Sequence, residues 1–176
     1  MIDQQSGRRR EFTVADGTAP ADVAHVHREA LRVLRHDIDT AHLDAYSDEA
    51  WPPAVVSSRE RALSLAREEV ACGTRSSRGD VGMGIDIDVR DDGQFEVMAD
   101  LAPYTIGAEG WEGDHLIFSA NDTGTSLWIA VTGEQETVLR SRLEALGVPS
   151  TALVPHAPRG RRRLRSWCAR AEPGGR

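Results

Sequence analysis

Histidine and aspartate are concentrated between residues 25 and 44, where the residue types are best suited to acid–base or metal chemistry. The side chains concerned are His25, His27, His36, Asp37, Asp39, His42 and Asp44. Imidazole can act as a general base near neutral pH, and imidazole together with carboxylate can bind a divalent metal. Chemistry that requires an ε-amine is excluded, because all 21 basic residues are arginine.

The spacing of these residues argues against a shared metal site on one element. Apolar residues at three- and four-residue steps predict a helix over residues 22–46. His27, Asp37 and Asp44 would lie within or beside its apolar stripe, where a polar side chain needs a partner. His27 and Asp37 would be about 15 Å apart along a straight helix, too far to share one metal. Asp37 could alternatively cap a new helix after a break at His36.

A second group of carboxylates alternates with apolar residues between residues 83 and 101. This alternation predicts two antiparallel strands, 83–90 and 94–101. A three-residue loop, Asp91–Gly93 with Gly93 in the left-handed conformation, pairs Val89 with Phe95 and keeps the apolar face whole. A two-residue loop would mix the two faces. We therefore predict the three-residue loop.

This register places four carboxylates on the outer face of the hairpin. They are Asp86, Asp88, Glu96 and Asp100. Like charges directly opposed across strands are unfavourable. Three interpretations remain open: solvated side chains near Arg90, a surface that docks a cationic partner, or a divalent metal site, for which carboxylates alone are a weak signal. Trp51 and Trp111 lie in predicted loops beside carboxylates, where each could anchor its loop or contact an arginine- or lysine-bearing surface.

The distribution of charge bears on partners. The chain has a net charge of −7, and residues 11–158 hold 26 carboxylates against 11 arginines, a net of −15, between basic ends of +2 over 1–10 and +6 over 159–176. Such a body repels nucleic acid phosphate and attracts cationic surfaces. The Arg-rich tail could contact phosphate, but weak association with the acidic body of its own chain, or no function, is the favoured interpretation. Two cysteines with no zinc-type spacing indicate free thiols.

Further elements follow from capping and turn signals. Ser57 and Glu60 predict the start of a second helix that ends at Gly73, and Thr132 with Gln135 predicts the start of a C-terminal helix. Residues 115–131 predict a second hairpin, in which Phe118 pairs with Leu127 across a four-residue loop. Residues 102–113 are expected to form a loop, and 151–154 a short strand.

Together these elements predict an α+β fold with two N-terminal helices, a four- to five-stranded mainly antiparallel sheet and a C-terminal helix. The expected organisation is a disordered arm over 1–19, a single domain over 20–155 and a disordered Arg-rich tail over 156–176.

We expect a small acidic soluble protein of the cytoplasm that binds a basic protein partner through Asp86, Asp88, Glu96, Asp100, Trp51 and Trp111. An immunity- or antitoxin-type inhibitor of a nuclease fits this charge best, because an acidic protein can occupy a phosphate-binding cleft. No catalytic residue, metal or cofactor is assigned, and no segment approaches the about 18 apolar residues of a membrane span. The alternative is a small enzyme or small-molecule-binding protein with a pocket between the first helix and the sheet, lined by His27, Asp37 and Asp44.

Overall fold

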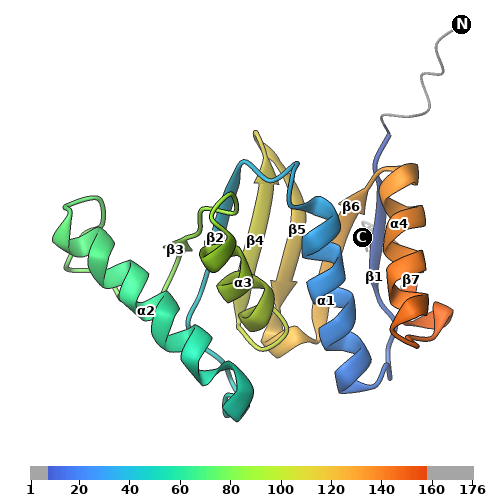
Figure 1. Ribbon diagram of the computed structural model, residues 1–176, viewed down its shortest axis with the longest axis horizontal. Helices are drawn as coiled ribbons and strands as arrows, with labels where there is room; N and C mark the ends of the chain where they lie inside the picture. The colour runs from blue at the N-terminus through green and yellow to red at the C-terminus, as the bar shows by residue number, and fades with distance from the viewer. Residues whose placement is uncertain (1–7, 158–176) are drawn as a thin grey trace, which may run out of the picture.

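A computed structural model describes residues 8–157, which fold into one seven-stranded sheet and four α-helices (Figure 1). The strands are β1 (Arg10–Val14), β2 (Thr40–Leu43), β3 (Ile85–Asp86), β4 (Gly107–Glu112), β5 (His115–Asn121), β6 (Ser126–Val131) and β7 (Leu153–Pro155). The helices are α1 (Pro20–Leu34), α2 (Val56–Ala71), α3 (Asp92–Leu101) and α4 (Gly133–Ala145). The strand order is β3-β2-β4-β5-β6-β1-β7, and every neighbouring pair is antiparallel.

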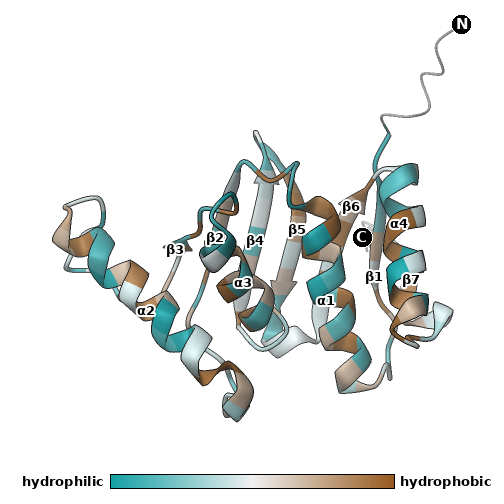
Figure 2. Ribbon diagram, viewed as in Figure 1, coloured by the Kyte–Doolittle hydropathy of each residue, from teal (hydrophilic) through white to brown (hydrophobic). Residues whose placement is uncertain are grey.

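The helices lie on one side of the sheet, with α1 and α3 over its middle, α4 over the β1 side and α2 beside α3 and β3 (Figure 1). Each helix alternates between hydrophilic and hydrophobic residues, as expected of helices that bury one side (Figure 2). The predicted α+β class with an antiparallel sheet is confirmed. Within residues 8–157, no helix combines the length and apolar character that crossing a membrane requires.

The strand register separates the two faces of the sheet. Phe12, Ile129 and Phe118 are paired across β1, β6 and β5 and are completely buried beneath the helices. Successive side chains of a strand point to opposite faces. The next residues along these strands therefore lie on the other face, where none of the helices in residues 8–157 covers the sheet. This second face is called the open face below.

The prediction of a hairpin over 83–101 is wrong, because Asp92–Leu101 form helix α3. The Asp91 carboxylate caps this helix by accepting a hydrogen bond from the backbone N–H of Gln94 at 2.8 Å. Met98 is completely buried, so the apolar stripe has helical spacing. Gly93 lies in the first turn of α3 rather than in a left-handed loop, and Val89 has no cross-strand partner at Phe95.

The boundaries near the N-terminus also differ from prediction. Helix α1 ends at Leu34, and residues 40–43 form β2, because His36–Asp39 turn the chain back towards the sheet. Arg10–Val14, inside the arm predicted to be disordered, form β1 and pair with β6 and β7. The loop predicted over 102–113 contains strand β4. The described residues therefore have four helices and seven strands, not three helices and four or five strands.

Two of the other local predictions are confirmed, and two are wrong in detail. Thr132 and Gln135 form the capping box at the start of α4, and Gly73 follows the end of α2 with a φ of +76°. The Ser57–Glu60 box is absent, since α2 begins at Val56 with no side-chain cap. The second hairpin exists with its register shifted by two residues, so that Phe118 pairs with Ile129. Residues 1–7 and most of the predicted tail, 158–176, lie outside the described residues.

Candidate functional site

Polar and aromatic side chains form rows across the open face, from one edge of the sheet to the other. One cross-strand row contains Asp86, His42, Glu109, Ser119, Trp128, Thr13 and Val154, in the order of the strands from β3 to β7. Apart from Trp128 and Val154, these residues are polar, as is usual for a sheet face that no other layer covers. The sheet order thus brings together residues from both ends of the described chain.

Carboxylates dominate the charge of this face. Glu11 and Asp86 are exposed, and Asp44 and Glu109 are half-buried. Within the strands of residues 8–157, no arginine occupies an open-face position, because Arg10 is on the helix side and pairs with Glu136 of α4 at 2.5 Å. The strand positions of the open face therefore carry carboxylates and no arginine, whereas the helix layer mixes both signs.

A hollow of about 350 Å³ lies in the open face near the β3 edge. It forms at Gly107, where a Cβ atom would lie 2.5 Å from Oδ2 of Asp44. His42, Glu109 and Asn121 line the hollow together with Asp44. The other Asp44 oxygen, Oδ1, accepts a hydrogen bond from the backbone N–H of Gly84 at 2.6 Å, which fixes the carboxylate in place. The hollow thus presents oxygen acceptors that suit a cationic, hydrogen-bond-donating group.

Apolar side chains accompany the carboxylates on the open face. Trp111 on β4 and Trp128 on β6 lie on the two strands that flank β5. Both indoles are half-buried. The Nε1–H of Trp128 donates to Oε2 of Glu11 at 3.2 Å. Partly exposed indoles beside carboxylates suit a surface that carries arginine or lysine.

His42 is the one histidine of the row and lies opposite Asp86. Its Nδ1 is 2.8 Å from Oδ1 of Asp86, and the two side chains are 42% and 73% exposed. So exposed a pair contributes little to stability. Among the described residues, no cluster of three or more histidine, cysteine or carboxylate side chains is arranged to hold a metal ion.

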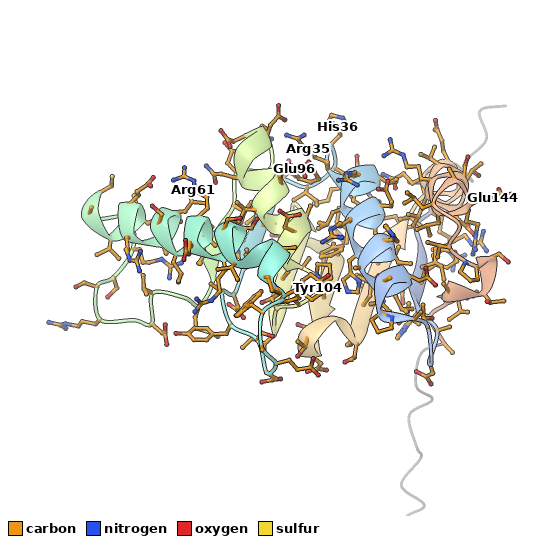
Figure 3. The ribbon with its side chains drawn as sticks, turned by 60° about the horizontal axis from the view of Figure 1, so that its bottom comes forward. Arg35, His36, Arg61, Glu96, Tyr104 and Glu144 are labelled. Carbon is orange, nitrogen blue, oxygen red and sulfur yellow. The ribbon has the colours of Figure 1, made fainter. Side chains whose placement is uncertain are left out.

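Of the residues predicted to bind a partner, only Asp86 and Trp111 lie on the open face. Glu96 and Asp100 are on α3, where Figure 3 shows Glu96 in the helix layer next to Arg35. Asp100 accepts a hydrogen bond from the Ser58 hydroxyl at 2.7 Å. The Asp88 carboxylate accepts from the backbone N–H of Arg90 at 2.9 Å. Trp51 packs against the core with the Arg59 guanidinium 5.9 Å from its ring. These residues do not share one surface.

The three residues proposed to line a pocket are also separated. His27 is completely enclosed by the core, and its Nδ1 lies 2.8 Å from the Val23 carbonyl oxygen. Its Nε2 has no hydrogen-bond partner, and burial lowers the pKa of His27 to about 4. A neutral, enclosed imidazole cannot reach a ligand. Asp44 lies instead in the hollow of the open face.

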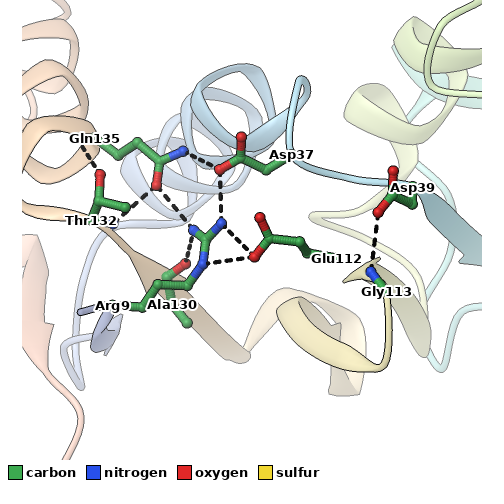
Figure 4. A network of polar contacts seen from close by, with 8 residues as sticks. All are labelled: Arg9, Asp37, Asp39, Glu112, Gly113, Ala130, Thr132 and Gln135. Atoms are coloured by element: carbon green, nitrogen blue, oxygen red, sulfur yellow. Dashed lines mark hydrogen bonds and ion pairs between the residues drawn. The ribbon is translucent and has the colours of Figure 1, made fainter. Parts of the chain in front are cut away.

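Asp37 belongs to a structural network centred on Arg9 (Figure 4). Asp37 Oδ2 accepts hydrogen bonds from Arg9 at 2.8 Å and from the Gln135 side chain at 2.7 Å. Arg9 also donates to Glu112 and to the backbone carbonyl of Ala130. Partial burial alone would raise the pKa of Asp37, but the hydrogen bonds from Arg9 and Gln135 outweigh burial and lower it. These contacts join β1, the turn after α1, β4, β6 and α4.

Three residues of the open face, Glu11, Glu109 and Trp128, are not among the predicted site residues. The prediction placed Glu11 in a disordered arm and Glu109 in a loop, and it placed Trp128 in the second hairpin without a site role. Strand alternation around Phe12 could have indicated Glu11, although two apolar residues form a weak pattern.

Comparisons with protein-family models, with curated proteins and with solved structures found no match to the chain.

Proposed function

We propose that the protein is a binding module that docks on a basic protein partner through the open face of its sheet. The observation that carries this proposal is the concentration of carboxylates and indoles on a face whose strand positions, within residues 8–157, carry no arginine. The partner is a basic protein, as expected from the sequence. The docking surface differs from that expectation, because it lies on strands β1–β6 and not around α3.

The charge supports fast and specific association with a cationic surface. Residues 8–157 hold 26 carboxylates and 14 arginines, a net charge of −12. A negative potential steers a basic partner towards the molecule, and the one-sided charge of the open face fixes the orientation of docking. Trp111 and Trp128 add buried area, which electrostatics alone does not supply. Inhibition of a nuclease by occupation of its phosphate-binding cleft is the specific role that this charge fits best.

A pair of matched variants tests the proposal. The face variant carries Glu11→Gln, Asp86→Asn and Glu109→Gln, and the helix-layer variant carries Glu60→Gln, Glu96→Gln and Glu144→Gln. Each variant removes three carboxylates without changing side-chain shape. The replaced residues of the helix-layer variant are exposed on α2, α3 and α4. Any difference between the variants therefore reports the position of the charge, not its amount.

The measurement is quantitative co-purification from the native lysate at low and high salt. A basic protein should be retained by the wild type and by the helix-layer variant. The face variant should bind it about tenfold more weakly at low salt, which corresponds to about 0.5 kcal/mol for each carboxylate. Equal retention by both variants, or a selective loss in the helix-layer variant, would overturn the proposal.

A further inference from the structure

We infer that the Arg-rich C-terminal segment of this same chain, residues 158–176, binds the open face and competes there with the basic partner. The contact within the chain stands on the geometry and charge given below. The competition rests in addition on the proposed function.

Charge complementarity is the first argument. Residues 158–176 hold seven arginines and one glutamate, a net charge of +6. The open face presents Glu11, Asp44, Asp86 and Glu109, with no arginine at its strand positions within residues 8–157. Arginine is suited to such a surface, because its planar guanidinium binds carboxylates in a bidentate manner and stacks on indoles. The segment and the face therefore match in both charge and chemistry.

The point at which the segment begins is the second argument. The backbone N–H of His156 donates to the carbonyl oxygen of Glu11 at 2.9 Å, so the chain leaves β7 beside β1. Glu11 is itself an open-face residue that accepts from Trp128. The segment thus starts at the rim of the open face, next to one of the carboxylates that would bind it.

The reach of the segment is the third argument. Seven strands separated by about 4.8 Å make the sheet about 30 Å wide from β7 to β3. Nineteen residues span at most about 60 Å when extended. The arginines of 159–165 can therefore reach Trp128 and Glu109, and the later part of the segment can reach Asp86. A tether of this kind gives an effective concentration in the millimolar range, so weak individual contacts suffice.

Full-length protein allows a direct test, because the chain has a cysteine in the segment. Cys168 can carry a nitroxide spin label once the exposed thiol of Cys72 is removed by Cys72→Ser. The probe is paramagnetic broadening of the indole N–H signals of Trp111 and Trp128 on the open face. Trp51 serves as the internal reference, because it lies on the loop before α2 and packs against the core.

The expected result is strong broadening of the Trp111 and Trp128 signals at low salt, weak broadening of Trp51, and recovery of all three at high salt. Arg161→Gln, Arg162→Gln and Arg163→Gln together should abolish the broadening. Arg61→Gln, Arg67→Gln and Arg78→Gln together make the same change in charge at exposed positions elsewhere and should leave the broadening in place. Broadening that is absent, or strongest at Trp51 or over the helix layer, would overturn the inference.

Partner affinity separates this inference from the proposed function. The triple-arginine variant of the segment should bind the basic partner several-fold more tightly than the wild type. Broadening with unchanged partner affinity would refute competition. A partner that binds the face in a protein without such broadening would refute the contact within the chain while leaving the proposed function intact.

Discussion

The Arg9 guanidinium donates a hydrogen bond to the Asp37 carboxylate at 2.8 Å, and this contact ties the start of β1 to the turn that follows α1 (Figure 4). The side chains of Arg9 and Asp37 are only 19% and 32% exposed. Arg9 directly precedes β1, which pairs with β6 and β7 and places Glu11 on the open face. A structural pair near the edge of the helix layer thereby positions part of the proposed docking surface.

Arg9→Met should lower the free energy of unfolding by about 1–3 kcal/mol, because hydrogen bonds to a charged group are lost and Asp37 keeps only Gln135. Chemical denaturation measures this change, and Arg8→Met at an exposed position is the control. The pKa of Asp37 is lowered in the fold from its ordinary value of 3.8. The ionised carboxylate therefore stabilises the fold at a pH above 3.8, and this stabilisation is lost as the pH falls through the lowered pKa. The difference in free energy of unfolding between Arg9→Met and the wild type should therefore become smaller in acid. A difference that becomes larger in acid would contradict the stabilising role of the Arg9–Asp37 contact.

His27 should make the protein sensitive to mild acid. Its pKa is lowered by burial from 6.5 to about 4 in the fold, so the unfolded chain binds the proton more readily. Stability should fall as the pH drops from about 6.5 to about 4, by up to about 3 kcal/mol. His27→Leu should remove this part of the pH dependence. Equilibrium unfolding of both proteins across that pH range is the measurement, and parallel curves would show that His27 does not titrate as described.

Gly124, in the turn after β5, can be compared with Gly147, which follows α4. Both have a positive φ, +81° and +76°, which penalises any side chain. A Cβ at Gly124 would lie 2.0 Å from the carbonyl oxygen of Pro103, whereas a Cβ at Gly147 meets nothing within 4 Å. Gly147→Ala should cost about 1 kcal/mol from backbone strain alone. Gly124→Ala should cost clearly more, and equal shifts in melting temperature would contradict the close approach to Pro103.

Local sequence signals were sufficient to predict the structure where a side chain acts within one helical turn of its own position. The Thr132–Gln135 capping box and the left-handed Gly73 are set by residues within one helical turn, and both were predicted. The segment 92–101 was misread because Phe95, Val97 and Leu101 alternate by chance while the Asp91 cap and buried Met98 specify a helix.

Strands β1 and β4 depend on distant parts of the chain. β4 carries glycine at 107 and 110, and a Cβ at Gly110 would lie 2.9 Å from Ile38 Cδ1, so the helix side admits no large residue there. An apolar alternation is consequently missing from its sequence. β1 pairs with β6 and β7, more than 110 residues away. The negative charge of the body could be predicted, but the sheet order decides which carboxylates share a face.

Site-specific photo-crosslinking in the native host tests the central claim most directly. A benzophenone side chain is placed at Ser126, exposed on the open-face side of β6, or at Ser141, exposed on α4. The account predicts an adduct with a basic protein from position 126 and none from position 141. It also predicts that the yield of the adduct falls strongly in the face variant and is unchanged in the helix-layer variant. An adduct that forms only from position 141, or one from position 126 that survives the face variant undiminished, would contradict docking through the open face.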